Sequence, residues 1–571
     1  MKISKILQHA RVFSRLLILI ACLQLLGAKE VTPNYKINGI SGDPLLNVQF
    51  RLNELYQHTP INKESPTSLQ EQIGKALSPY GYFRAKIAIA YTATGVLIDI
   101  DPGPQMHIAS LRAEVIGEGN NNQEILKTLH ELPIHAGDSF NNKLYTDAKD
   151  DLFSSAERQG FLHANFQKAE IRINLDSYRA DVVLVFDTGP QYYFGQLHFD
   201  PTYISPELLN RYVPFKMGEA YSTDQILAFN NNLSASGYFK SVVVKPQIDD
   251  QHDVPIYVHT QKAHRINYSY SLGYGTDTGP RGRVGMSVSP VNRWGHKFNA
   301  IAQGSMNENA VLAQYLIPGR NPVTDKYNIN GSLTNLNYSS GYSNSALISV
   351  GQQHVVSNFQ RAISLNGLSE RYRYTDESKN TKSLLFPKAN FTWRKVSDQL
   401  FSPTGYNFTL SGLVANKALL SEVSLAQATL DAKVAITVEP LRTRFYVHGI
   451  QGITQIDDIN NLPLSLAMLL GGSENLKGYT YDSIGPGKSL TFIGFEIQKE
   501  TFKKWYLTAS YDSGDVYNPA VRNFKHDVGL GLMWVSPIGP IKVGVAQAVN
   551  NDLSRVKDRN PKLVVNMGPD I

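Results

Sequence analysis

The sequence is poor in cysteine and charge, and it lacks long hydrophobic runs beyond its N-terminus. Cys22 is the only cysteine among 571 residues, and it lies in a segment that we expect to be removed, so the remaining chain can form no disulfide. Charged residues make up 18% of the chain, against roughly 25% in an average soluble protein. The longest later apolar run, 462–470, is interrupted by Pro463 and falls short of the ~18 residues of a membrane-spanning helix. If the chain spans a membrane, it must do so as a closed barrel, because lipid leaves no other way to pair the backbone.

The N-terminus has the pattern of a secretory signal peptide. Four basic residues within 1–15 precede an apolar core over 16–26, and Gly27-Ala28 is a small-residue cleavage site. We therefore expect a signal peptide over 1–28. The alternative is a lipoprotein signal over 19–22, which would leave a very short apolar run before its cysteine. The signal carries four of the six net positive charges, and its removal takes away the charge argument for nucleic-acid binding.

Three glycines, Gly81, Gly160 and Gly237, mark a repeat in the first half of the chain. They are 79 and 77 residues apart, and each is followed by an aromatic residue and a strand-like segment. Each also follows a helical pattern whose last apolar residue lies four positions earlier. This arrangement predicts a helix that ends at a glycine in the left-handed conformation, then an aromatic anchor, then a strand.

A second strand follows in each repeat, and two of these strands end in matching turns, Asp-Pro-Gly-Pro-Gln over 101–105 and Asp-Thr-Gly-Pro-Gln over 187–191. The unit is therefore strand, helices, strand and strand. It resembles the POTRA domain, in which two helices pack on a three-stranded sheet, and the segments 137–140 and 218–221 match its Gly-acid-x-aromatic pattern. We predict POTRA-like domains over 29–104, 105–190 and 191–262.

From His264 onward the sequence alternates between apolar and small polar residues. Apolar or aromatic residues at 266, 268, 270, 272 and 274 alternate with small polar residues, and the last segment over 562–567 behaves likewise. This period of two is typical of membrane strands with lipid outside and a wet lumen inside. At ~10 residues per strand, the domain over 263–571 holds about 16 strands. A large soluble β-sandwich is the alternative.

A glycine-rich loop over 471–487 interrupts this alternation and carries one cation, in the motif Leu476-Lys477-Gly478-Tyr479. Three POTRA-like units before a barrel with such a loop resemble the Omp85 superfamily. Its barrels carry a long extracellular loop that folds back into the lumen, with an aliphatic-Arg-Gly-aromatic tip. The resemblance implies that Leu476, Lys477, Gly478 and Tyr479 anchor the loop in the lumen. Lysine in place of arginine keeps the charge but lacks the planar bidentate fork.

The same resemblance implies where this cation binds. The acidic partners in the superfamily lie on the strands after the loop, and the matching residues here are Glu496 and Asp512. We therefore expect Lys477 to pair with Glu496, Asp512 or both. A charge pair in a confined lumen is screened less than one on a surface, so it can hold a loop in place. The alternative is an ordinary solvated lysine at a loop tip.

The segments 37–42 and 567–571 resemble the TamA branch of the superfamily, the outer-membrane subunits of translocation and assembly modules. Three POTRA units also fit this branch. The resemblance implies a factor that inserts unfolded outer-membrane proteins such as autotransporters, with a TamB-like partner anchored in the inner membrane. It implies a barrel in the lipid of a Gram-negative outer membrane, with POTRA domains in the periplasm. One alternative is a two-partner secretion translocator that exports a dedicated exoprotein. Another is a passive porin, which should lack the repeats.

The weak seam of such a barrel is where its first and last strands meet. Pro569 cannot donate to a ladder, so we expect short pairing there and an exposed edge. We predict that substrate strands add at this seam by β-augmentation. The predicted seam residues are Arg265, Ile266, Tyr268, Tyr270, Leu563, Val565, Gly568 and Pro569.

Marks of an enzyme are missing from the sequence. The segment 485–489 hints at a phosphate-binding loop, but Asp482 stands where that motif requires glycine. The sequence contains neither a G-x-S-x-G nor an HExxH motif. We therefore expect no catalytic residues, no cofactor, no metal site and no nucleic-acid partner.

Overall fold

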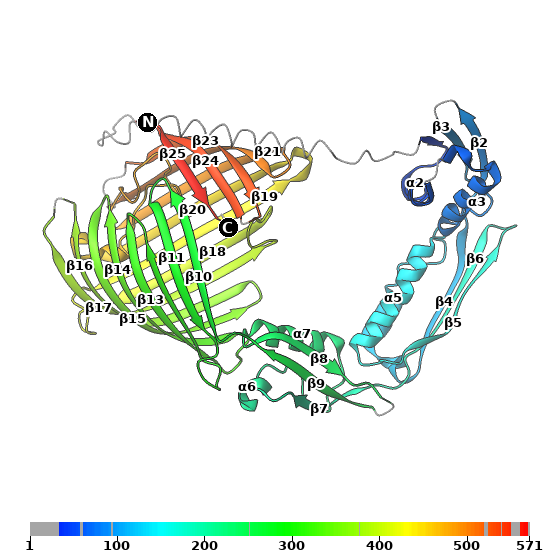
Figure 1. Cartoon of the computed structure of the whole chain (residues 1–571), viewed down its shortest axis with the longest axis horizontal. Helices are drawn as coiled ribbons and strands as arrows, with labels where there is room; N and C mark the ends of the chain where they lie inside the picture. Colours follow the sequence, from blue (N-terminus) through cyan, green and yellow to red (C-terminus); the bar gives the residue numbers. More distant parts are fainter. Residues whose placement is uncertain are drawn as a thin grey trace, which may run out of the picture. The chain divides into compact units, whose positions relative to one another are not determined.

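A computed structural model describes residues 34–56, 61–92, 95–249, 252–375, 377–518, 523–537, 539–549 and 560–568 (Figure 1). The predicted signal peptide, with Cys22, and Pro569 lie outside the described residues. Within the described part, no helix combines the length and the apolar character needed to cross a bilayer.

The first repeat folds into a three-stranded sheet of order β1-β3-β2 with two helices. Helix α3 begins where the Ser65 hydroxyl accepts a hydrogen bond from the Ser68 backbone N–H, which satisfies one of the free donors of its first turn. A short 3₁₀ turn then ends at Gly81, whose φ of 85° places it in the left-handed region. The elements are β1 (Tyr35–Asn38), α2 (Gly42–Tyr56), α3 (Pro66–Leu77), β2 (Lys86–Thr92) and β3 (Gly95–Asp101).

The second and third repeats have the same topology, with sheet orders β4-β6-β5 and β7-β9-β8. Gly160 and Gly237 have φ values of 86° and 71°, so all three predicted glycine caps are left-handed. The elements are β4 (His107–Ile116), α4 (Gln123–His130), α5 (Asn142–Arg158), β5 (Asn165–Asn174), β6 (Arg179–Asp187), β7 (Tyr193–Phe199), α6 (Pro206–Asn210), α7 (Thr223–Ala235), β8 (Phe239–Pro246) and β9 (Asp253–Lys262).

The helices of the first two units cover one face of their sheets, and Figure 1 shows α5 lying along the β4-β6-β5 sheet. In the second unit, Leu152 of α5 packs in one buried cluster with Leu184 and Phe186 of β6, and all three are fully buried. In the first unit, Leu52 and Ile98 bring helix and central strand together in the same way. Burying each such side chain stabilises its unit by about 1.5–3 kcal/mol.

The second half of the chain forms a single 16-stranded sheet in which every strand pairs antiparallel with the next. The strands are β10 (Ile266–Gly275), β11 (Gly279–Val288), β12 (Lys297–Gly304), β13 (Glu308–Pro318), β14 (Asp325–Tyr338), β15 (Gly341–Val356), β16 (Phe359–Tyr374), β17 (Asn380–Val396), β18 (Gly405–Ala415), β19 (Leu425–Val438), β20 (Thr443–Ile456), β21 (Ser489–Phe502), β22 (Trp505–Tyr517), β23 (Lys525–Ser536), β24 (Gly539–Ala548) and β25 (Lys562–Met567). The predicted fold class, three α+β repeats followed by a barrel of about 16 strands, is confirmed.

The barrel is nearly closed, and its two end strands are β10 and β25, drawn in green and red in Figure 1. Strand β10 has ten residues, whereas β25 has six. Within the described residues, no backbone ladder joins the two strands. The turn after β10 does contact β25, through a hydrogen bond of 3.2 Å from the Val565 backbone N–H to the Thr276 hydroxyl. The barrel therefore has one weak junction, at the predicted seam.

Candidate functional site

The connection between β20 and β21, residues 457–488, packs against inward-facing side chains of the barrel and is called the lumen loop below. Inward positions follow from the register: Ile493, Phe495 and Ile497 of β21 are exposed, while the alternating residues Glu496 and Gln498 are buried. The predicted anchor residues Leu476 and Tyr479 are buried as well. A loop with a buried leucine and tyrosine must have a fixed partner surface, and the barrel wall supplies it.

The first half of the lumen loop lies against β16. The Ser465 backbone N–H donates to the Glu370 carboxylate at 3.0 Å, and the Ser465 hydroxyl donates to the same carboxylate. The Tyr372 and Tyr374 hydroxyls donate to loop carbonyls at 2.9 and 2.8 Å. These contacts fix the beginning of the loop on one side of the lumen.

The tip of the loop carries Lys477, whose ammonium donates to the Asp512 carboxylate of β22 at 2.7 Å. The side chain of Asp512 is 2% exposed, so this pair is largely removed from water. Burial alone would lower the pKa of Lys477, but the carboxylates of Asp512 and Glu496 hold that pKa above its ordinary value. The loop is thus positioned by a buried cation that stays charged.

The second predicted partner, Glu496, has a different direct contact. Its carboxylate accepts hydrogen bonds from Lys542 of β24 at 2.8 Å and from Gln498 at 2.6 Å. The structure therefore brings Lys477 to Asp512, while Glu496 acts on Lys477 through its nearby charge.

Asp527 of β23 also holds the tip, although it was not among the predicted residues. It lies directly opposite Asp512 in the β22–β23 register and accepts a hydrogen bond of 3.0 Å from the Gly478 backbone N–H. The pattern that identifies it is an acidic residue at an inward position of a consecutive strand. A two-point contact results, with the Lys477 side chain on one carboxylate and the adjacent backbone on the other.

Gly478 fits this wall because it has no side chain. A Cβ atom there would lie 2.6 Å from the Ala548 nitrogen and 2.8 Å from the Asp527 Cβ, both too close for any real contact. The inward positions of β23 and β24 near the tip are small, including Gly529, Gly544 and Ala546. This stretch of wall therefore leaves room for a backbone to approach it closely.

Replacing Gly478 with alanine will displace the loop tip, because the atoms it meets belong mainly to backbone that cannot move aside. We expect the docked position of the loop tip to be destabilised by about 1–3 kcal/mol, which is typical of overpacking. This destabilisation is measured as faster protease cleavage of the loop in the folded barrel. Gly331→Ala in β14 is the matched control, since a Cβ there meets nothing within 4 Å. Equal cleavage rates for the two variants would contradict the steric argument.

The lumen loop also touches both sides of the seam. The Ser473 backbone N–H donates to Asp277, in the turn after β10, at 2.6 Å. On the other side, Asn566 of β25 donates to Glu474 and the Lys562 ammonium donates to the Thr480 hydroxyl, both at 2.8 Å. None of the residues that make these contacts was predicted from sequence.

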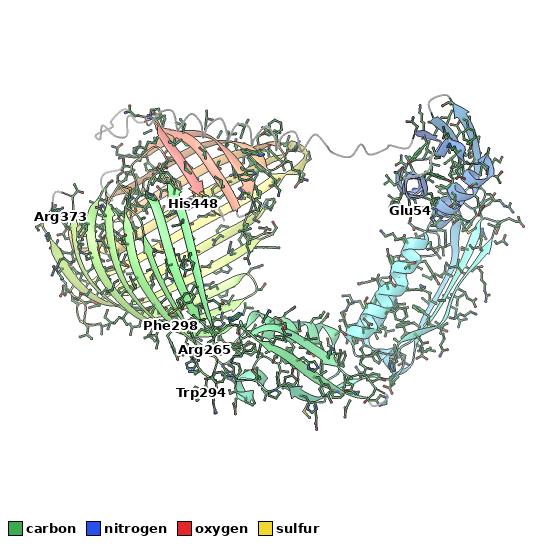
Figure 2. The ribbon with its side chains drawn as sticks, in the orientation of Figure 1. Glu54, Arg265, Trp294, Phe298, Arg373 and His448 are labelled. Carbon is green, nitrogen blue, oxygen red and sulfur yellow. The ribbon has the colours of Figure 1, made fainter. Side chains whose placement is uncertain are left out.

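The predicted seam residues of β10 and β25 divide into two groups. Ile266, Tyr268, Tyr270 and Leu563 face outward and are 48–74% exposed. The Arg265 side chain, labelled in Figure 2, instead donates to the Pro290 and Val291 carbonyls at 2.9 and 2.6 Å, in the turn between β11 and β12. The Gly568 backbone N–H donates to the Pro540 carbonyl at 3.0 Å, on the β24 side. Arg265 and Gly568 thus stabilise the two halves of the seam separately.

A model of the Omp85 superfamily domain matches residues 259–560, which is more than half of the chain. This chain belongs to the Omp85 superfamily. Its members transport or assemble proteins at the outer membrane. In particular, residues 34–102 match the model of the first POTRA domain of TamA, so the N-terminal repeat is of the TamA type. Residues 192–262 match a POTRA model described as a surface antigen variable number repeat.

A solved structure shares this fold. BamA from Haemophilus ducreyi lacking POTRA domains 1-3 is similar with a TM-score of 0.67 at 14% identity, over 81% of this chain and 99% of that one. CdiB from Acinetobacter baumannii matches over 93% of this chain and 100% of that one at 12% identity, with a TM-score of 0.47.

Proposed function

We propose that this protein inserts other β-barrel proteins, autotransporters among them, into the outer membrane by pairing their strands with its seam. The carrying observation is the edge of β10. Within the described residues, β10 pairs with β11 on one side and has no ladder on the other, although it is four residues longer than β25. An open edge of this kind is a template for a further strand.

The side chains of β10 suit a strand in this position. Tyr268, Tyr270 and Leu272 are 61%, 74% and 92% exposed on the outer face, where a new strand would add its own apolar residues. Ser269 and Ser271 on the inner face are small and polar. An added strand that alternates apolar and polar residues would continue both faces of the barrel.

The lumen loop holds the inner side of this seam. When β10 and β25 separate, the loop must lose either its contact with Asp277 on one side or its contacts with Lys562 and Asn566 on the other. We propose that Leu476, Lys477, Gly478 and Tyr479 anchor the loop to the wall through Asp512, with Glu496 as a supporting charge. The anchor then keeps the loop in place beside the opening seam.

In this proposal the POTRA-like repeats bind the unfolded substrate before it reaches the barrel. Their limits are 29–104, 105–190 and 191–262. Each sheet has an edge strand, namely β2, β5 or β8, that accepts an extended chain by the same backbone pairing. We propose that these repeats lie in the periplasm, because the TamA-type first repeat supports a TamB-like partner anchored in the inner membrane.

Reconstitution tests this function. The full chain is placed in lipid vesicles, and an autotransporter β-domain is added from urea in the presence of periplasmic chaperone. We expect folding, measured as heat-modifiable gel mobility and protease protection, to be accelerated at least several-fold over vesicles that contain an unrelated porin. An equal rate in both vesicles would contradict the proposal. Uptake of an exoprotein without accelerated barrel folding would instead identify a two-partner secretion translocator.

A further inference from the structure

An open cavity of about 610 Å³ lies on the inner side of the seam, beside the edge of β10. Its lining includes Ser271 and Gly273 of β10, Arg281 and Arg283 of β11, and Gly568 at the end of β25. The two arginines are the feature of this cavity that the barrel fold itself does not require.

The register places both arginines on the inner face. Arg281 is opposite Gly273 and Arg283 is opposite Ser271, and these positions alternate with the outward-facing Tyr270, Leu272 and Tyr274. Two residues apart on one strand, the guanidinium groups lie on the same side and can act on one ligand.

Arg281 extends across β10 toward the open edge. A Cβ at Gly273 would lie only 3.0 Å from the Arg281 Nε and 3.3 Å from its Cγ, which shows that this side chain lies over the glycine. Neighbouring strands are about 4.8 Å apart, so a side chain whose Nε lies over β10 directs its guanidinium toward the next position in the sheet. That position is where an added strand would lie.

The charges of the two arginines are not paired within the described part of the chain. Among the described residues, neither guanidinium has a hydrogen-bond or ion-pair partner. Glu308, an acid in the cavity lining, accepts a hydrogen bond from Gln303 at 3.0 Å, and Asp277, in the turn between β10 and β11, accepts one from Ser473 at 2.6 Å. Two guanidinium groups beside an open strand edge favour a carboxylate, which they bind with charge-assisted hydrogen bonds.

We propose that Arg281 and Arg283 form a carboxylate-binding site for the strand that pairs with β10. The inference rests on the proposed function. A strand that continues the antiparallel barrel has its C-terminal end toward Ile266, away from Ser271 and Gly273. The ligand is therefore an aspartate or glutamate side chain on the lumen face of the incoming strand, and the pair selects strands that carry such a residue.

Three synthetic peptides test this site on the full chain in lipid nanodiscs. The parent peptide alternates aromatic residues with serine and threonine and carries one glutamate at a serine position. The second peptide has glutamine there, and the third keeps glutamate but has a C-terminal amide. Affinity is measured by fluorescence anisotropy. We expect the parent and the amide to bind roughly tenfold more tightly than the glutamine peptide, a preference typical of hydrogen bonds to charged groups, and we expect added salt to reduce this preference.

Arg281→Gln with Arg283→Gln should abolish the preference, because glutamine keeps polar donors but no charge. Lys388→Gln is the matched control: this lysine faces inward on β17, opposite Ser364, and lines a different cavity, so the preference should persist. Heat-modifiable mobility verifies that each variant is folded. A preference that survives in the double variant, or equal binding of all peptides to the unaltered protein, overturns the site. Weaker binding of the amide alone would mean that the arginines bind a terminal carboxylate, which overturns the side-chain assignment. If no peptide binds the unaltered protein, strand addition to β10 fails, and the site fails with it.

Discussion

A disulfide between cysteines at positions 276 and 565 will abolish the insertion of substrate barrels, and reduction will restore it. The two positions face each other across the seam, since the Val565 backbone N–H donates to the Thr276 hydroxyl at 3.2 Å. The β10–β11 ladder extends over ten residue pairs. Across the seam, by contrast, the described residues form no ladder, and the bond to Thr276 is joined by contacts of the lumen loop with Asp277, Lys562 and Asn566. At about 1 kcal/mol net per hydrogen bond, separating the seam costs less than separating β10 from β11. A covalent link removes this low-energy opening.

Insertion is measured with Thr276→Cys and Val565→Cys together, in the vesicle assay, before and after reductant. Each single variant controls for the loss of the native side chain. A second double variant, Val434→Cys with Val447→Cys, controls for a disulfide elsewhere in the barrel. These two residues lie directly opposite each other on β19 and β20. We expect only the oxidised seam pair to lose activity. Full activity of the oxidised seam pair would show that substrates do not pass through the seam.

The sequence predicts the fold well because the periodicities that encode it are local. The three glycines at near-constant spacing mark chain reversals that every repeat needs, and all three are left-handed in the structure. Strand limits are predicted less well. Tyr327 to Thr334 is recognisable as strand from sequence, whereas β14 extends over Asp325–Tyr338. The ends of such strands no longer face lipid, so the alternation that marks their centre fades there.

The candidate site is predicted only in part, because some of its residues are marked by a local motif and others are brought together by strand register. The motif over 476–479 identifies the loop tip, and the acids on the following strands narrow its partners to Glu496 and Asp512. The roles of Asp527, Lys542 and Asp277 depend on strand register and on contacts across the barrel. Asp527 meets the tip because the β22–β23 ladder places it opposite Asp512. Register is a property of the whole sheet, so no short stretch of sequence contains it.

Replacing Lys477 with glutamate will release the lumen loop from the barrel wall. The change leaves Asp512 buried without its cation and places another carboxyl group beside the acids of the wall. Breaking a buried ion pair costs about 3–5 kcal/mol. We expect protease cleavage of the loop to rise at least tenfold in folded barrel and insertion activity to fall with it. Lys477→Met removes the charge without reversing it. We expect its rate of loop cleavage to lie between those of the glutamate variant and the unaltered protein.

Arginine at this position gives the opposite result. The Oδ1 atom of Asp527 is buried and accepts no hydrogen bond from the described residues, while its Oδ2 accepts from the Gly478 backbone. Asp512 lies opposite Asp527, so a planar guanidinium fork at position 477 can donate to both carboxylates where the lysine donates to one. We expect Lys477→Arg to protect the loop from protease more strongly than lysine does, in the order Arg, Lys, Met, Glu. Protection by Met equal to that by Arg would show that apolar packing of Leu476 and Tyr479, and not the charge pair, holds the loop.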